Sequence, residues 1–295
     1  AKSLPPIRAP RLSRTRRGHV RKVQALAWHK DSKRLRAADQ GGNAVLWDAM
    51  HAARLKFASA HFVLAASLHP TRQIAALGAM DNLVTLYDTS EADGPECRLM
   101  RQLEGHDGYI SSLLHVPGAD AAGAGGGVLL SASGDGLILA WDDETSKITA
   151  RFEGHAAECG SLCRPTAAAG GSSLFATASS DGTVRVWDLR SAQLAHRIQL
   201  PTEADACAFF PTGTAVVAGC KDGSVTLFDV RSSAPLRAFA RPKSRVTSID
   251  VSSSGRCVYA GYEDGYVCGW DPFSEAAKDA PSYAFKLDAH HTIAG

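Results

Sequence analysis

The sequence predicts an all-β protein built from repeated four-stranded units, and three observations support this prediction. An aromatic residue followed by Asp recurs at intervals of 40, 54, 46, 41 and 42 residues. A tight-turn signal precedes almost every one of these dipeptides. The flanking segments alternate between apolar and polar residues or run apolar, which is typical of strands. A period of about 40–45 residues ending in Trp-Asp is the signature of propeller blades.

The aromatic-Asp dipeptides place the repeat ends near residues 48, 88, 142, 188, 229 and 271, within a predicted propeller of residues 18–290. They are Trp47-Asp48, Tyr87-Asp88, Trp141-Asp142, Trp187-Asp188, Phe228-Asp229 and Trp270-Asp271. Three repeats open on a Gly-His pair, at Gly18, Gly105 and Gly154. The predicted fold class is therefore a WD40 β-propeller with six recognisable blades.

The turn signals predict how the second and third strands of a blade are joined. They are Met80-Asp81-Asn82, Gly134-Asp135-Gly136, Ser180-Asp181-Gly182, Lys221-Asp222-Gly223 and Glu263-Asp264-Gly265. We expect two-residue hairpin turns, because Asp-Gly and Asp-Asn supply positive φ angles. The first repeat has Gly41-Gly42 instead.

Two sets of polar residues match the buried hydrogen-bond chain of WD-repeat proteins, which links a Trp N–H through a hydroxyl and a His to an Asp. The sets are His106, Ser131, Asp135 and Trp141 in the third repeat, and His155, Thr177, Asp181 and Trp187 in the fourth. Buried indole and imidazole groups need such partners. Because the set recurs, a structural role is favoured over a hydrolase triad, for which one site suffices. With no P-loop or nucleophile elbow, we expect no catalytic residue and no enzyme.

Composition narrows the function classes further. The net charge is +2, so the whole molecule does not favour a nucleic-acid partner. Seven cysteines, an odd and sparse number, argue against a disulfide scaffold and for a reducing, cytoplasmic location. No Cys/His spacing predicts a metal, no motif predicts a cofactor, and no run of 18 apolar residues predicts a membrane span.

Two segments interrupt the repeat spacing, and one end of the chain is basic. Glu91–Cys97 is expected between blades and Ala119–Gly127 inside the third repeat, both as exposed loops. Residues 1–22 carry eight Lys or Arg and no acid. They either contact phosphates, anionic lipid or an acidic protein, or form a solvated tail that leads into a strand.

From about residue 11 to 290 the chain resembles the β subunit of heterotrimeric G proteins. The segments that carry the resemblance are Arg16-Arg-Gly-His19, Ala79-Met-Asp-Asn-Leu83, Leu103-Glu-Gly-His-Asp-Gly-Tyr-Ile-Ser111, Phe209-Phe-Pro-Thr-Gly213 with Leu227-Phe-Asp-Val-Arg231, and Val246-Thr-Ser-Ile-Asp-Val-Ser-Ser-Ser-Gly255 with Ala260-Gly-Tyr-Glu-Asp264. A Gly-His to Trp-Asp pattern is generic, whereas the last two groups are more specific.

The resemblance implies that one narrow face of the propeller binds the Gα subunit and effectors. The matching positions are Val20, Lys22, Gln40, Phe62, Leu64, Met80, Asn82, Tyr109, Glu158 and Glu203. An apolar and aromatic centre with a polar rim is typical of an interface. The alternative is that Leu64 and Met80 belong to the inter-blade core.

The chain departs from the family pattern at four other positions, which neighbour the ones just listed. Gln24 stands for a Tyr, Gly160 for a Met, Ser180 for a Cys and Lys221 for an Asp. The last substitution reverses a charge, and like charges across an interface cost binding energy.

The two ends also depart from the family. Family members begin with a long helix that coils against a Gγ subunit, but Pro5, Pro6 and Pro10 disfavour a helix here. A Gγ-like partner would then contact only the propeller flank. Residues 1–17 resemble the outer strand that closes a seventh blade, residues 283–287 an outer strand of the sixth, residues 289–290 the start of a seventh, and 291–295 a tail.

The expected architecture is thus six blades of a seven-bladed type, with the last blade missing or incomplete. Completion by a partner strand is preferred to closure with six blades or to truncation, because open edges are avoided.

The expected function is that of a G protein β-subunit-like scaffold in signal transduction. Its partners would be Gα, a Gγ-like subunit and effectors, reached in the cytoplasm and peripherally at the inner face of the plasma membrane. The alternative is a structural WD40 subunit of a large multiprotein assembly, outside any G protein trimer.

Overall fold

The computed structural model describes residues 19–29, 34–48, 53–58, 61–90, 97–117, 127–166, 173–240, 244–274 and 285–288. Within these ranges the chain forms six four-stranded antiparallel sheets and no helix. Each sheet is a simple meander, since its strands follow one another in chain order. The fold is all-β, and the six sheets are the six blades of a β-propeller.

Blades 1, 2 and 3 contain the first twelve strands. Blade 1 contains β1 (Val23–Trp28), β2 (Arg34–Asp39), β3 (Asn43–Asp48) and β4 (Ala53–Ala58). Blade 2 contains β5 (Val63–Leu68), β6 (Ile74–Ala79), β7 (Val84–Asp88) and β8 (Arg98–Leu103). Blade 3 contains β9 (Ile110–Val116), β10 (Val128–Ser133), β11 (Ile138–Asp142) and β12 (Ile148–Phe152).

Blades 4, 5 and 6 contain the remaining twelve strands. Blade 4 contains β13 (Cys159–Cys163), β14 (Leu174–Ser179), β15 (Thr183–Asp188) and β16 (Gln193–Gln199). Blade 5 contains β17 (Ala204–Phe209), β18 (Ala215–Cys220), β19 (Ser224–Asp229) and β20 (Pro235–Ala240). Blade 6 contains β21 (Val246–Val251), β22 (Val258–Tyr262), β23 (Tyr266–Trp270) and β24 (Phe285–Asp288). Each aromatic-Asp dipeptide thus falls at the end of a third strand.

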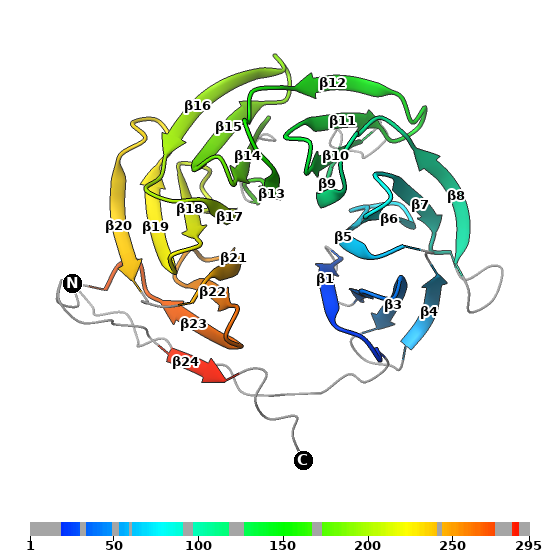
Figure 1. Cartoon of the computed structure of the whole chain (residues 1–295), viewed down its shortest axis with the longest axis horizontal. Helices are drawn as coiled ribbons and strands as arrows, with labels where there is room; N and C mark the ends of the chain where they lie inside the picture. The colour runs from blue at the N-terminus through cyan, green and yellow to red at the C-terminus, as the bar shows by residue number, and fades with distance from the viewer. Residues whose placement is uncertain are drawn as a thin grey trace. The chain divides into compact units, whose positions relative to one another are not determined.

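The described residues divide into two compact units, 19–160 and 161–288, which we call the N-terminal and C-terminal units. In the N-terminal unit, the first strands β1, β5 and β9 lie on one side and the fourth strands β4, β8 and β12 on the other (Figure 1). Apolar side chains fill the space between neighbouring blades of this unit. Leu46 and Leu77 contribute between blades 1 and 2, and Leu86 and Leu129 between blades 2 and 3.

The C-terminal unit is packed in the same way. Val186 and Phe209 lie between blades 4 and 5, and Val217 and Trp270 between blades 5 and 6. A glycine in the second strand allows the closest approach: a Cβ at Gly219 would lie 2.5 Å from Cγ1 of Val246 in the next blade. Strand interiors disfavour glycine unless another group must come this close.

The turns between second and third strands differ from the expected two-residue hairpins. In blade 3 four residues, 134–137, separate β10 from β11, and the N–H of Gly136 donates to the Ser133 carbonyl at 3.2 Å. Only Gly136 adopts a positive φ, of 80°. Asp135 acts through its side chain, whose Oδ1 accepts the N–H of Leu137 at 2.8 Å. The two-residue prediction was therefore wrong, because the aspartate acts as a hydrogen-bond acceptor and not as a left-handed residue.

Four further aspartates act in this way. Asp81, Asp181, Asp222 and Asp264 accept the N–H of the residue two positions later, at 3.2, 2.9, 2.9 and 3.3 Å.

The remaining segment predictions have mixed outcomes. The insertion at residues 91–97 joins β7 to β8 of the same sheet, so its expected place between blades was wrong. Residues 91–96 and 119–126 themselves lie outside the described ranges. Residues 1–17 and 289–295 also lie outside them, and with them the predicted closing strand and the start of a seventh repeat. Of the predicted strand at 283–287, the described part is β24, which pairs with β23.

Candidate protein-binding surface

One backbone hydrogen bond recurs at the same end of five blades. The first residue after the second strand, here called the turn residue, donates its N–H to the carbonyl of the residue just before the first strand, here called the approach residue. The pairs are Gln40 to Lys22, Met80 to Phe62, Gly134 to Tyr109, Lys221 to Glu203 and Glu263 to Arg245, at 2.9–3.0 Å. Each bond holds two surface side chains of one blade next to each other.

A third position of the same surface comes from a bulge in the first strand. The pairing of first and second strands skips Gln24, Leu64, Ser111, Asp205 and Thr247, one in each of these blades. A bulge re-aims the side chain of the unpaired residue. Approach, turn and bulge residues together form the turn surface of each unit, and six of the ten predicted partner-binding residues are approach or turn residues.

The turn surface of the N-terminal unit is rich in apolar and aromatic groups. Phe62 and Met80 are each 51% exposed, and the ring of Tyr109 lies over Gly134, where a Cβ would be 2.7 Å from Cε1 of the ring. The exposure of Met80 excludes the alternative that it belongs to the core. Leu64, the bulge residue of blade 2, is half-buried beside this group.

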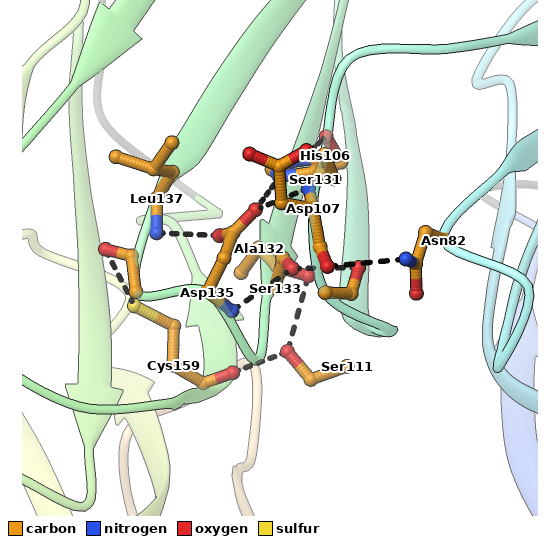
Figure 2. Close-up of polar contacts among 12 residues, drawn as sticks. Asn82, His106, Asp107, Ser111, Ser131, Ala132, Ser133, Asp135, Leu137 and Cys159 are labelled. Atoms are coloured by element: carbon orange, nitrogen blue, oxygen red, sulfur yellow. Dashed lines mark hydrogen bonds and ion pairs between the residues drawn. The ribbon is translucent and has the colours of Figure 1, made fainter.

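The other predicted residues of this unit surround the apolar group to different degrees. Val20 and Lys22 are exposed, whereas Gln40, Asn82 and Glu158 are half-buried. Asn82 has a φ of 66° and takes the place that glycine has in the other turns. Its side-chain amide donates to the Asp107 carbonyl of the next blade at 3.1 Å, as Figure 2 shows.

The turn surface of the C-terminal unit is charged instead. The tenth predicted residue, Glu203, forms an ion pair with Lys221, its own turn residue. Beside it, the Arg245 guanidinium binds both carboxylate oxygens of Asp205, at 2.7 and 2.9 Å. Each of these charges therefore has an intramolecular partner of opposite sign.

Behind the turn surface of blade 3 lies a complete hydrogen-bond chain, of which Figure 2 shows His106, Ser131 and Asp135. The Trp141 indole N–H donates to the Ser131 hydroxyl at 2.8 Å. Nε2 of His106 lies 2.8 Å from the same hydroxyl, and Nδ1 lies 3.0 Å from Oδ2 of Asp135. The chain ties the second strand, the third strand and the approach to the first strand together.

Two of these groups have shifted pKa values. Burial lowers the pKa of His106, although Asp135 opposes this shift, so the ring is neutral at pH 7. Burial would raise the pKa of Asp135, but the N–H of Leu137, His106 and the N–H of Asp107 bring it below its usual value. A neutral His between an ionised Asp and a hydroxyl fits a structural tie.

Blade 4 has the corresponding Trp and hydroxyl: Nε1 of Trp187 donates to the Thr177 hydroxyl at 2.9 Å. Asp181 accepts hydrogen bonds from both the N–H and the hydroxyl of Thr183. His155 belongs to the other unit, and its role in this chain stays a prediction.

Blade 1 contains a His–Asp pair that the turn signals did not indicate. Nδ1 of His19 lies 2.8 Å from Oδ2 of the buried Asp39, which precedes Gly41-Gly42. Asp39 also accepts the N–H groups of Gly41 and Asn43, at 2.8 and 3.1 Å. Burial would raise the pKa of Asp39, but these hydrogen bonds lower it. Where blade 3 has Ser131, blade 1 has Ala37, and Nε2 of His19 is buried with no hydrogen-bond partner among the described residues.

A buried polar cluster between blades 2 and 3 was also not predicted. Nδ1 of His69 accepts the N–H of Arg72 at 2.8 Å, so the ring proton is on Nε2, which lies 3.1 Å from Oδ2 of Asp143. Nearby, Nδ1 of His115 lies 2.9 Å from the Ser67 hydroxyl. Burial lowers the pKa of His115 to about 3. Blade 1 also has a histidine at the place of His69, but the other residues recur in no other described blade, so the repeat pattern gave no signal for the cluster.

Neither a metal centre nor a membrane crossing is found in the described part of the chain. No cluster of three His, Cys, Asp or Glu side chains in the described ranges is arranged to hold a metal ion. No helix among the described residues has the length and apolar character that a membrane crossing requires.

Comparison with known proteins agrees with the repeat structure. Residues 233–271 match the WD domain, G-beta repeat model, and residues 149–245 match the model of the Nucleolar protein 10-like, N-terminal domain. Each of these models covers less than half of the chain.

Similar full-length proteins carry the name guanine nucleotide-binding protein subunit beta. The Nicotiana tabacum protein is 32% identical over 274 residues, which are 86% of this chain and 70% of the relative. The Oryza sativa subsp. japonica protein is 33% identical over 276 residues, 88% of this chain and 70% of the relative. The Arabidopsis thaliana protein is 32% identical over 278 residues, with the same two shares. With this identity over most of both chains, and with six blades that follow the repeat, the chain belongs to the family of guanine nucleotide-binding protein β subunits.

Proposed function

We propose that this chain is a non-enzymatic signalling scaffold that binds a G protein α subunit, and in turn effectors, through the turn surface of its N-terminal unit. The names of its relatives support a scaffold of the G protein β-subunit class. The pairing of Phe62 with Met80 carries the proposal, because two large apolar side chains are held half exposed by a backbone bond.

The chemistry around this pair fits a protein partner. Tyr109 adds an aromatic ring, and Lys22 and Gln40 supply a polar rim. Binding energy concentrates in aromatic and apolar groups that become fully desolvated, while rim residues contribute orientation and association rate. No nucleic acid, cofactor or metal has a role in this proposal.

The test is the affinity of the purified protein for a GDP-bound Gα subunit, measured by surface plasmon resonance. The double substitution Phe62→Ala with Met80→Ala should weaken binding by about 30- to 700-fold, since it removes two anchors of roughly 1–2 kcal/mol each. Both side chains are exposed, so the thermal unfolding midpoint should hardly change.

The matched control is Leu194→Ala with Leu236→Ala, two exposed apolar residues on the fourth strands β16 and β20. This variant should bind as the unchanged protein does. Equal losses in both variants, or no binding of the unchanged protein to any Gα, would contradict the proposal.

A second function is favoured by the ion pair of Glu203 with Lys221. A partner that uses Glu203 must first displace Lys221, and this disfavours partners of the usual G protein kind. The alternative is therefore a structural subunit of a large multiprotein assembly. An affinity pull-down from native extract separates the two: Gα with a small Gγ-like subunit supports signalling, and a fixed set of assembly proteins without either supports the alternative.

The blades are proposed to be of the seven-bladed type. In the N-terminal unit, Val63 of blade 2 and Ile110 of blade 3 are fully buried by the preceding blade. In blade 1 two side chains of β1 on the equivalent side are largely exposed, Leu26 by 65% and Trp28 by 61%. A further blade or a partner strand would bury them. Class averages of the natural full-length protein by electron microscopy would count the blades, and a closed six-fold ring would contradict this proposal.

Location and the remaining partner follow from the same proposal. The protein would work in the cytoplasm and reach the inner face of the plasma membrane only through its partners. A Gγ-like subunit would contact the flank of the propeller. Its recovery together with Gα in the pull-down is the expected result.

A further inference from the structure

Two cysteines of the C-terminal unit lie side by side where blades 4 and 5 meet. Sγ of Cys163, at the end of β13, is 3.4 Å from Sγ of Cys207 in β17. Both are free thiols. A disulfide has an S–S distance of about 2.0 Å, so the two sulfurs would have to move closer by about 1.4 Å to form a bond.

Cys207 stands at a position that two other blades fill with an aliphatic side chain. Cys207 pairs with Ala218, as Leu113 of blade 3 pairs with Ser131 and Ile249 of blade 6 with Ala260. Cys207 and the partly buried Cys163 both pack within the apolar cluster of blades 4 and 5. An aliphatic side chain can fill the position of Cys207. Packing between blades 4 and 5 therefore does not by itself require a cysteine on both sides of their boundary.

We propose that Cys163 and Cys207 are a redox modification site, at which hydrogen peroxide forms a disulfide that joins blade 4 to blade 5. This inference is independent of the partner proposed above. Cys163 is the more exposed of the two residues and is assigned the first step.

The reaction balances with peroxide as the only oxidant. The Cys163 thiolate attacks one peroxide oxygen, an S–O bond forms, the O–O bond breaks, and hydroxide leaves to become water. The Cys207 sulfur then attacks the sulfenic sulfur, the S–S bond forms, and the S–O bond breaks to release a second water. Two thiols lose two electrons and two protons, and hydrogen peroxide is reduced to two waters.

The surroundings of the pair set its rate. Burial, together with the neighbouring Cys207 thiol, raises the pKa of Cys163. Only the thiolate reacts, so oxidation should be slow at pH 7 and faster at pH 9. The pair would respond to sustained oxidant and not to brief pulses.

Peptide mapping of the purified chain tests the proposal. After treatment with excess hydrogen peroxide and alkylation of free thiols, trypsin should release residues 152–185 joined to residues 198–221, because it does not cleave before Pro165. Each peptide holds two cysteines, so tandem fragmentation between Cys159 and Cys163, and between Cys207 and Cys220, assigns the bond. The expected bond is Cys163–Cys207, and it should disappear on reduction.

Three variants keep the test decisive. Cys163→Ala and Cys207→Ala should each abolish the cross-link, whereas Cys220→Ala, at a buried thiol of the same cluster, should not. Oxidation should raise the thermal unfolding midpoint of the unchanged protein by several degrees and leave that of Cys207→Ala unchanged, because a cross-link restricts the unfolded chain. Alkylation of both thiols after exhaustive treatment, or a bond between other cysteines, would overturn the proposal.

Discussion

Blades 1 and 3 of the N-terminal unit place a His and an Asp in the same mutual arrangement, yet only blade 3 completes the chain to its tryptophan. In blade 3, Ser131 receives the Trp141 indole N–H and lies against His106. In blade 1 the His19–Asp39 pair is present, but Ala37 offers no hydroxyl. The contact between histidine and aspartate can therefore form without the contacts to a hydroxyl and a tryptophan.

The two carboxylates also reach their histidines from different places in the chain. Asp135 lies in the turn, whereas Asp39 is the last residue of β2, two positions earlier in the repeat. Both accept backbone N–H groups of the turn as well as the histidine. One aspartate thus both accepts the backbone N–H groups of the turn and orients the histidine, and it can do so from either of the two positions.

The largest effect should follow from removing the hydroxyl in blade 3. Ser131→Ala leaves the Trp141 indole N–H and one His106 nitrogen buried without their partner, at a cost of about 2–4 kcal/mol of unfolding free energy. Urea denaturation measures this loss. Thr149→Val removes a less buried hydroxyl of the same blade and should cost well under half as much; equal losses would show that the chain adds nothing.

The next largest effect should be a loss of unfolding free energy at acidic pH, caused by the buried neutral histidines. His115 has a folded-state pKa of about 3 against 6.5 when unfolded, and burial lowers that of His106 as well. Since the unfolded chain takes up protons first, these histidines should lower the stability as the pH drops from about 6.5 towards 3.

Urea denaturation at several pH values measures that slope. His115→Asn keeps an acceptor for the Ser67 hydroxyl and cannot titrate, so its stability should depend less on pH. An unchanged slope in His115→Asn would exclude this histidine as its source.

The smallest effect should come from completing the chain in blade 1. Ala37→Ser offers a hydroxyl to Nε2 of His19 and should raise the unfolding free energy by up to about 1 kcal/mol. Ala38→Ser is the matched control, because Ala38 faces the apolar boundary with blade 2, and a hydroxyl there should destabilise. A loss of stability in Ala37→Ser would mean that the two blades do not share one design.

The sequence was most informative where the repeat is local. The aromatic-Asp dipeptides locate all six blades, and the residues proposed for the chain of blade 3 lie at hydrogen-bond distances. Asp39 was missed because it stands two residues before the expected turn position. A side-chain hydrogen-bond acceptor is predicted from its fixed spacing to the other residues of the repeat. Asp39 has a different spacing, although it forms the same hydrogen bond to a histidine.

Contacts between blades could not be predicted in the same way. His69 and Asp143 are 74 residues apart, and although blade 1 has His29 at the position of His69, the aspartate recurs in no other described blade. Only packing of blade 2 against blade 3 brings them together. Likewise, the ion pair of Lys221 with Glu203 depends on a backbone bond between turn and approach residues, which no single repeat displays.

That backbone bond has a consequence for how such a surface can evolve. The main chain fixes the positions of the approach and turn side chains. Substitutions of these side chains should therefore have little effect on the stability of the fold. Phe62 with Met80, Glu203 with Lys221, and Lys22 with Gln40 occupy the same frame with apolar, ionic and mixed character. Successive duplications of one blade would thus supply a row of independently variable sites, and a lineage could exchange one partner for another by changing two residues at a time without risking the scaffold.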